Sequence, residues 1–173
     1  MAIWHFDVYL VPRKGIERLH SSLEGVLGSY KSTNDDDPSW QLETEDNPIN
    51  KDYPNYWYGL LPKEERAKFL GPTFNRTDSW SEEALMFVSE GGSRLGFWDD
   101  EIHCQIDVRN LEQKVVENVL ELARALDCVL VLSEAQAVIP PDVLLLQQQI
   151  EASTAGAFSS DPKGTLARLL RKS

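Results

Sequence analysis

Hydrophobic and polar side chains alternate strictly in two stretches of the chain, and each stretch predicts a β-strand, the first over residues 3–11 and the second over 101–109. Successive side chains of a strand point to opposite faces of a sheet, so each strand should present one apolar and one polar face. The apolar rows contain Trp4, Phe6, Val8 and Leu10 in the first strand and Ile102, Cys104, Ile106 and Val108 in the second.

Two further stretches, residues 14–27 and 111–126, carry apolar residues at helical spacing and predict amphipathic helices. Residues 128–132 are apolar at every position, which is typical of a strand that is buried on both faces.

A hairpin is expected before the second alternating stretch. Residues 84–90 predict a strand, and the glycine pair that follows suits a tight turn. The return strand should begin at residue 94 and continue through a bulge at Asp99 and Asp100 into the stretch 101–109.

The resulting order of strand, helix, strand, strand, helix, strand predicts one α+β domain over residues 1–173, with a ferredoxin-like split β-α-β-β-α-β sheet. In that arrangement the first and third strands are adjacent and parallel, and both helices pack on one face. Residues 29–82 would form a long irregular insertion. Residues 134–173 would form a C-terminal extension, mainly helical, with a short strand at 135–139.

The polar rows of the two alternating strands should meet on the face of the sheet that the helices leave open. They contain His5, Asp7, Tyr9, His103, Gln105, Asp107 and Arg109. Histidines beside carboxylates are a common arrangement for acid–base chemistry, and they also occur in purely structural ion pairs. We favour the structural interpretation. Apolar residues at the edges of this face predict a cover, which would be the insertion, the tail helix or a second copy of the chain in a homodimer.

The insertion combines dense acidic residues with aromatic residues. Candidate partner-binding residues are Asp35, Asp36, Asp37, Trp40, Tyr56 and Trp57. Exposed acidic groups favour encounter with a basic partner, and aromatic side chains are frequent anchors of protein interfaces.

Charge and composition narrow the classes of function. The chain has 17 Lys and Arg against 28 Asp and Glu, a net charge of −11, which argues against nucleic-acid or anionic-membrane binding. It lacks a signal-peptide pattern and a run of 18 apolar residues, so we expect a cytoplasmic protein. Cys104 and Cys128 lie in apolar runs and should be reduced and buried. No metal-ligand or cofactor motif is present, and the aspartate triplet does not fit a calcium loop, so neither a metal nor a cofactor is expected.

Parts of the second half of the chain resemble a group of small bacterial proteins. These parts are Ile106-Asp107-Val108-Arg109, the helix that leads into 128–132, and the Ser160-Asp161-Pro162 stretch of the tail. Some proteins of this group are classed with the immunity proteins of polymorphic toxin systems. The resemblance implies a bacterial cytoplasmic protein with an acidic surface that occludes a toxin, and it transfers no catalytic residues.

Two functions are therefore expected from the sequence. The first is a non-enzymatic protein that binds a basic partner protein, such as a toxin, through the insertion. The alternative is a small enzyme or ligand-binding protein that uses the polar cluster on the sheet face.

Overall fold

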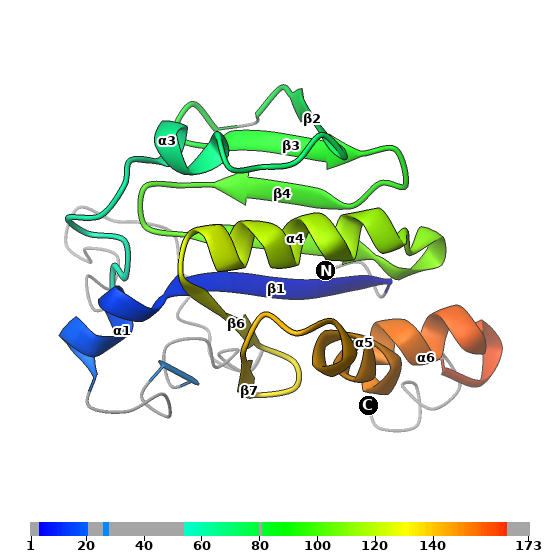
Figure 1. The fold of residues 1–173 in the computed structure, drawn as a ribbon. Coiled ribbons are helices and arrows are strands. Elements are labelled where there is room, and N and C mark those ends of the chain that lie inside the picture. The colour runs from blue at the N-terminus through cyan, green and yellow to red at the C-terminus, as the bar shows by residue number, and fades with distance from the viewer. Residues whose placement is uncertain (1–3, 21–25, 28–53, 80, 166–173) are drawn as a thin grey trace, which may run out of the picture.

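A seven-stranded antiparallel sheet forms the centre of the molecule (Figure 1). The structure is a computed structural model that describes residues 4–20, 26–27, 54–79 and 81–165. The strands run in the spatial order β2-β3-β4-β5-β1-β6-β7. Their bounds are β1 His5–Pro12, β2 Phe74–Thr77, β3 Leu85–Ser89, β4 Arg94–Phe97, β5 Ile102–Asp107, β6 Cys128–Leu132 and β7 Ala137–Ile139.

The helices lie around this sheet (Figure 1). They are α1 Arg13–Leu19, α3 Lys63–Ala67, α4 Gln113–Ala125, α5 Val143–Ala152 and α6 Thr154–Ser160, together with a short 3₁₀ helix, η2 Val108–Asn110. Asp142 caps α5 by accepting a hydrogen bond from the backbone N–H of Leu145 at 3.0 Å. In the part of the chain that the structure describes, no helix is long and apolar enough to cross a membrane.

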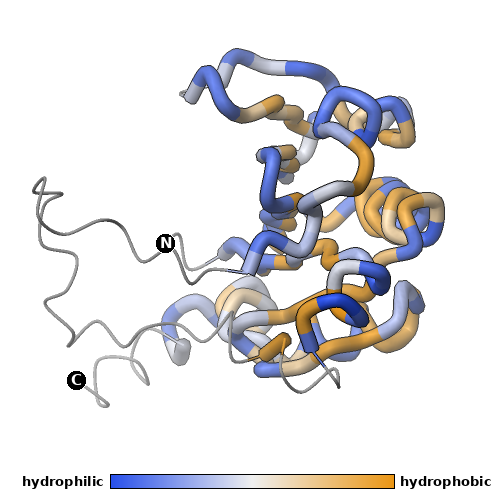
Figure 2. The backbone as a smooth tube through the Cα atoms, turned by 90° about the vertical axis from the view of Figure 1, so that its left-hand side faces the viewer, coloured by the Kyte–Doolittle hydropathy of each residue, from blue (hydrophilic) through white to orange (hydrophobic). Residues whose placement is uncertain are grey.

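The main hydrophobic core lies between one face of the sheet and helices α4 and α5. Alternate residues of β1 and β5, among them Val8 and Ile106, are fully buried there against Val115 and Val119 of α4. Figure 2 views the molecule from the side and shows α4 against this side of the sheet, with hydrophobic and hydrophilic positions alternating along its coil. The predicted apolar faces of both strands and of α4 are therefore confirmed.

Helix α1 packs on the opposite face of the sheet, so the prediction that both helices share one face is wrong. Ile16 is buried in a second, smaller cluster with Val11, Val129 and Val131. These three residues alternate with the core residues of β1 and β6, and so they point away from α4. Leu19, one of the apolar residues of the helix predicted over 14–27, is 42% exposed.

The ferredoxin-like arrangement is also wrong, and the reason is a turn where a bulge was expected. Residues 98–101 reverse the chain, and the backbone N–H of Trp98 donates to the carbonyl of Glu101 at 2.9 Å. Strands β4 and β5 are consequently separate and antiparallel. The additional reversal makes β5 antiparallel to β1, where the split pattern requires the two to be parallel.

The predicted insertion contains regular structure near its end. The short helix α3 begins at Lys63, directly after Pro62, which is its N-cap residue. Strand β2, an edge strand paired with β3, was not predicted because it is short and has one apolar residue, Phe74, in four. The Gly91-Gly92 turn is confirmed, and Gly92 has the positive φ of 91° that such a turn favours. Cys104 and Cys128 are buried and form no disulfide.

Candidate functional site

The antiparallel register of β1 and β5 brings the predicted polar residues together on the face away from α4. His5 pairs with Asp107, Asp7 with Gln105, and Tyr9 with His103. Side chains directly opposite on one face of an antiparallel pair have Cβ atoms about 5 Å apart. The cluster therefore exists as the sequence predicts, although its strands run in opposite directions.

Asp7 and His103 form the centre of this cluster. The Nε2 atom of His103 lies 2.8 Å from Oδ1 of Asp7, and the Gln105 amide donates to the same oxygen at 3.2 Å. The His103 ring stacks on Tyr9 with ring centroids 4.4 Å apart. The Asp7 side chain is 6% exposed and that of His103 is 18% exposed. A carboxylate that holds one imidazole nitrogen fixes the orientation of the ring, as in many acid–base sites.

The contacts of Asp7 explain its protonation state. Burial alone would raise the pKa of this carboxyl. The hydrogen bond and the coulombic attraction of His103, together with the hydrogen bond from Gln105, outweigh burial and hold the pKa below its usual value. Asp7 is thus an ionised, paired carboxylate at neutral pH.

Asp107 and Arg109 form a separate pair beside the centre. The Arg109 Nε and its backbone N–H each donate to Oδ1 of Asp107 at 3.0 Å, and Nη2 lies 2.5 Å from Oδ2. These hydrogen bonds lower the pKa of Asp107 against the effect of its burial. The guanidinium also lies over the Trp4 ring, 4.3 Å from its centroid. Both charges are paired, and we interpret this part of the predicted cluster as structural.

A groove of about 470 Å³ opens on the same face over strands β2 to β5. Met86, Val88 and Trp98 supply its hydrophobic lining, and its polar lining includes Asp78, Arg94, Glu101, His103 and Gln105. Gly96 shapes the groove, because a Cβ atom at this position would lie 2.3 Å from the Trp98 ring. The missing side chain lets the indole lie against the sheet beside Met86.

Glu101 is the most unusual charge in the groove. Its side chain is partly buried, and burial raises the pKa of its carboxyl. The nearby charges of Asp100 and Asp7 raise the pKa further, and His103 opposes them. The hydrogen bond of His103 goes to Asp7. Glu101 is therefore a desolvated carboxylate close to two others, those of Asp7 and Asp100.

Arg94, Trp98 and Glu101 were missed as site residues in the sequence. The expected bulge at Asp99 and Asp100 would have ended the alternating pattern there. Recognised as a turn, the same residues continue the pattern: Trp98 pairs directly with Glu101, one row beyond the pair of Gly96 with His103. The alternating pattern therefore contained the signal for these site residues, and the interpretation of Asp99 and Asp100 as a bulge concealed it.

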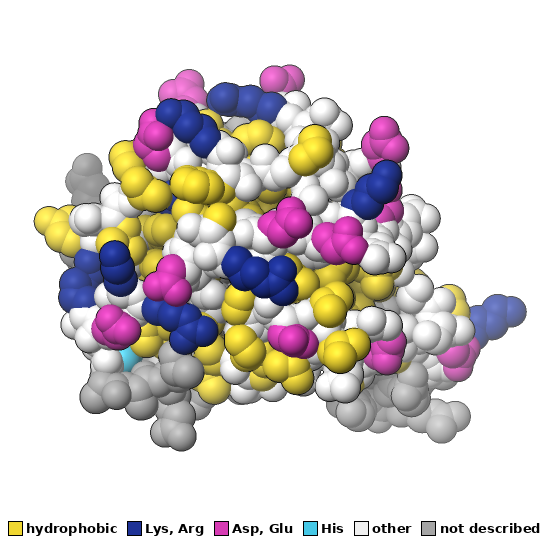
Figure 3. All heavy atoms as spheres, in the orientation of Figure 1, with side chains coloured by type: hydrophobic (Ala, Val, Ile, Leu, Met, Phe, Trp, Pro, Cys, Tyr) yellow, Lys and Arg dark blue, Asp and Glu magenta, His cyan; other side chains and the backbone are white. Residues whose placement is uncertain are grey.

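The opposite face of the molecule has a different character. Figure 3 shows Lys and Arg side chains interspersed with Asp and Glu side chains over α4 and its surroundings. Such mixing gives no strong field of either sign. The groove, on the face away from α4, combines charged groups with a hydrophobic lining.

The predicted partner-binding residues of the insertion divide into two groups. Asp35, Asp36, Asp37 and Trp40 lie outside the described residues. Tyr56 and Trp57 are 2% and 5% exposed, so little of either ring is available to a partner.

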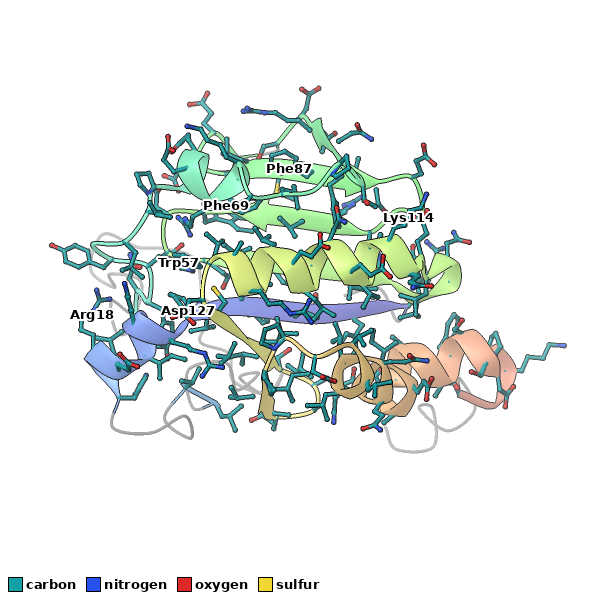
Figure 4. The ribbon with its side chains drawn as sticks, viewed as in Figure 1. Arg18, Trp57, Phe69, Phe87, Lys114 and Asp127 are labelled. Atoms are coloured by element: carbon teal, nitrogen blue, oxygen red, sulfur yellow. The ribbon has the colours of Figure 1, made fainter. Side chains whose placement is uncertain are left out.

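The surroundings of the two rings show how they are held. The Tyr56 hydroxyl lies 2.8 Å from Nε2 of His20. The Trp57 ring lies 4.3 Å below the guanidinium of the buried Arg66, between α1 and α3 (Figure 4). Burial lowers the pKa of Arg66 to about 10. These two aromatic residues join the segment before α3 to the rest of the domain.

Within the described residues, no group of three or more His, Cys, Asp or Glu side chains is arranged to hold a metal ion. Comparison of the chain with models of protein families, with curated proteins and with solved structures gives no match. The geometry of the groove is therefore the basis for any functional proposal.

Proposed function

We propose that this protein is a binding protein that holds a small organic molecule in the groove over β2 to β5. The observation that carries the proposal is the groove itself, a hollow of about 470 Å³ with aromatic and aliphatic lining and several convergent charged groups. Pockets for small molecules typically have volumes of about 300–1,000 Å³ and combine an apolar lining with a few placed polar groups.

Two apolar side chains of β3 on the groove face support this proposal. Met86 and Val88 point away from the main core and are only partly buried, beside the exposed edge strand β2. Apolar side chains in a concave, partly exposed position gain free energy when a ligand covers them. His103 is held by Asp7 at the side of the groove, so a ligand would meet an imidazole of fixed orientation.

A screen of small molecules with two tryptophan variants tests the proposal. Thr77→Trp should fill the groove, because Thr77 lines it from the edge strand β2. Arg76→Trp is the matched control, since Arg76 is exposed on the same strand and points to the opposite face. Saturation-transfer NMR should find molecules that bind the wild-type chain and the Arg76→Trp variant but do not bind the Thr77→Trp variant. If every molecule that binds also binds the Thr77 variant, the groove is not the binding site.

A basic partner protein remains the second candidate, and one feature favours it. Exposed acidic side chains gather at the end of the sheet where β3 begins and β4 ends, namely Glu82, Glu83, Asp99 and Asp100. Together with the net charge of −11, they would speed encounter with a basic surface. In this form the protein acts as a non-enzymatic interaction protein of the bacterial cytoplasm, of the kind that neutralises a toxin.

Charge reversal at the turn tests this second candidate. Asp99→Lys with Asp100→Lys should reduce capture of basic proteins from a bacterial lysate, and Glu117→Lys with Glu121→Lys on α4 provides the same change in charge elsewhere. An equal reduction by both pairs would show that net charge, and no particular surface, determines capture.

A further inference from the structure

We infer that the groove recognises an amphoteric molecule, with a cationic group of the ligand placed at Glu101 and an anionic group placed at Arg94. The molecule would be a basic amino acid or a compound of similar length and charge. This inference rests on the proposed binding function and specifies its ligand.

The first observation is the state of the charges on this face of the sheet. Asp7 is paired with His103, and Asp107 with Arg109. In contrast, neither the Glu101 carboxylate nor the Arg94 guanidinium has a hydrogen bond or an ion pair with any other described residue. Both of these unpaired groups line the groove. Arg94 is exposed, whereas Glu101 is partly buried and has, among the described residues, only the coulombic attraction of His103, so a cationic group of a ligand would stabilise its carboxylate.

The second observation is the distance between these two groups along the sheet. Glu101 pairs with Trp98, and Trp98 is four residues beyond Arg94 on the chain that forms β4. At about 3.3 Å per residue, the two backbone positions are roughly 13 Å apart along the strand. One charge therefore marks each end of the groove, with Gly96 and His103 in the row between them.

The third observation is the indole of Trp98 at the Glu101 end. It lines the groove and lies against the sheet at Gly96, and the backbone N–H of Trp98 donates to the carbonyl of Glu101, so the two residues are neighbours across the turn. An aromatic face next to a carboxylate is a recurring arrangement for recognising an ammonium or guanidinium group. Asp78, which also lines the groove, adds a further negative charge. The opposite end offers a guanidinium, which suits a carboxylate.

Three related molecules test this assignment. L-arginine carries both charged groups, agmatine lacks the carboxylate, and L-norvaline lacks the guanidinium. Titrations followed by calorimetry should show that wild-type protein binds L-arginine at least tenfold more tightly than either analogue. Absence of millimolar binding of L-arginine would overturn the inference.

Single variants assign each ligand group to one end of the groove. Glu101→Gln should remove most of the preference for L-arginine over L-norvaline and leave its preference over agmatine. Arg94→Gln should do the reverse. Glu117→Gln on the outer side of α4 is the control and should retain both preferences. If both site variants lose the two preferences equally, or neither loses any, the assignment is wrong.

Failure of this inference can be distinguished from failure of the proposed function. Some molecules could bind the wild-type chain but not the Thr77→Trp variant, without following the charge pattern above. That result would support the groove as a binding site and reject the amphoteric ligand. Binding of L-arginine that is unchanged by Thr77→Trp would place it outside the groove and reject the inference as well.

Discussion

Three carboxylates on the face of the sheet away from α4 have different surroundings, and their pKa values follow from these surroundings. Asp7 and Asp107 are buried and hydrogen-bonded, which holds their pKa values low. Burial raises the pKa of Glu101, whose carboxylate forms no hydrogen bond or ion pair within the described residues. The first two carboxylates stabilise the fold at neutral pH, and Glu101 opposes it. Groups that reduce stability are common at binding sites, where the ligand provides the missing interaction.

Replacing Glu101 by Gln should therefore stabilise the protein at pH 7. A carboxyl whose pKa is raised in the folded state favours folding most at low pH, and this contribution is lost as the pH rises through the folded-state pKa. The melting temperature of Glu101→Gln should exceed that of wild type at pH 7, and the two values should converge below pH 4. A lower melting temperature for the variant at pH 7 would show that the carboxylate has a partner.

Replacing His103 by Ala should have the opposite effect. It removes the main hydrogen-bond partner of the buried Asp7, at a cost of about 1–3 kcal/mol in the free energy of unfolding. Since the Asp7 pKa is lowered in the folded state, the wild-type advantage is present at neutral pH and is lost as the pH falls through that pKa. Urea unfolding of both proteins at pH 7 and pH 3 measures the difference. An equal loss at the two pH values would contradict the role of the ion pair.

Strands and helices differ in how far the sequence determines them. The strict alternation of β1 and β5, the apolar run of β6 and the stripe of α4 depend on local periodicity and are confirmed. The turn at residues 98–101 was missed because Asp99 and Asp100, although aspartate is a frequent turn residue, were interpreted as a bulge within one continuing strand. Which face α1 covers depends on tertiary contacts, and its own seven residues do not determine it.

The same contrast applies to the candidate site. The six members of the predicted polar cluster that are on β1 and β5 lie on one face, because alternation alone places them there, and Arg109 lies in η2. The groove was not predicted, because it depends on where β2 and β3 lie and on the space above Gly96. Neither can be derived from a single stretch of sequence.

Helix α1 meets the segment before α3 at Gly15, and this contact provides a test at the level of elements. A Cβ atom at Gly15 would lie 2.1 Å from the backbone carbonyl oxygen of Tyr56. Gly15→Ala should reduce the free energy of unfolding by about 1–3 kcal/mol, the usual range for overpacking. Lys14→Ala, at an exposed neighbouring position, is the control and should change stability little. Equal stability of the two variants would show that α1 does not contact this segment at Gly15.

At the level of the whole molecule, the stability of the fold depends on the core between the sheet and helices α4 and α5. Ile106 has no exposed surface and lies on the central strand pair β1–β5. The exposed Leu144 of α5 is 65% accessible to solvent and provides a matched aliphatic control. Substitutions at these two positions compare the effect on stability of a core residue with that of a surface residue in the same domain.

Ile106→Ala should lower the free energy of unfolding by about 2–5 kcal/mol, because it leaves a cavity in a close-packed interior. Leu144→Ala should remain within about 0.5 kcal/mol of wild type, as is typical at the surface. Equilibrium urea denaturation of both variants gives the comparison. A large effect at Leu144 would indicate that a second copy of the chain covers this helix.

The central position of β1 has a consequence for the order of folding. Strands β2 to β5 follow one another both in the chain and in the sheet, and their contacts form over short loops. Strand β1 instead lies between β5 and β6, and His5 pairs with Asp107, about 100 residues away. During synthesis at roughly 5–20 residues per second, β1 must wait on the order of 5–20 seconds before β5 exists. Throughout that interval its apolar side cannot reach its final position against α4, which follows β5 in the chain.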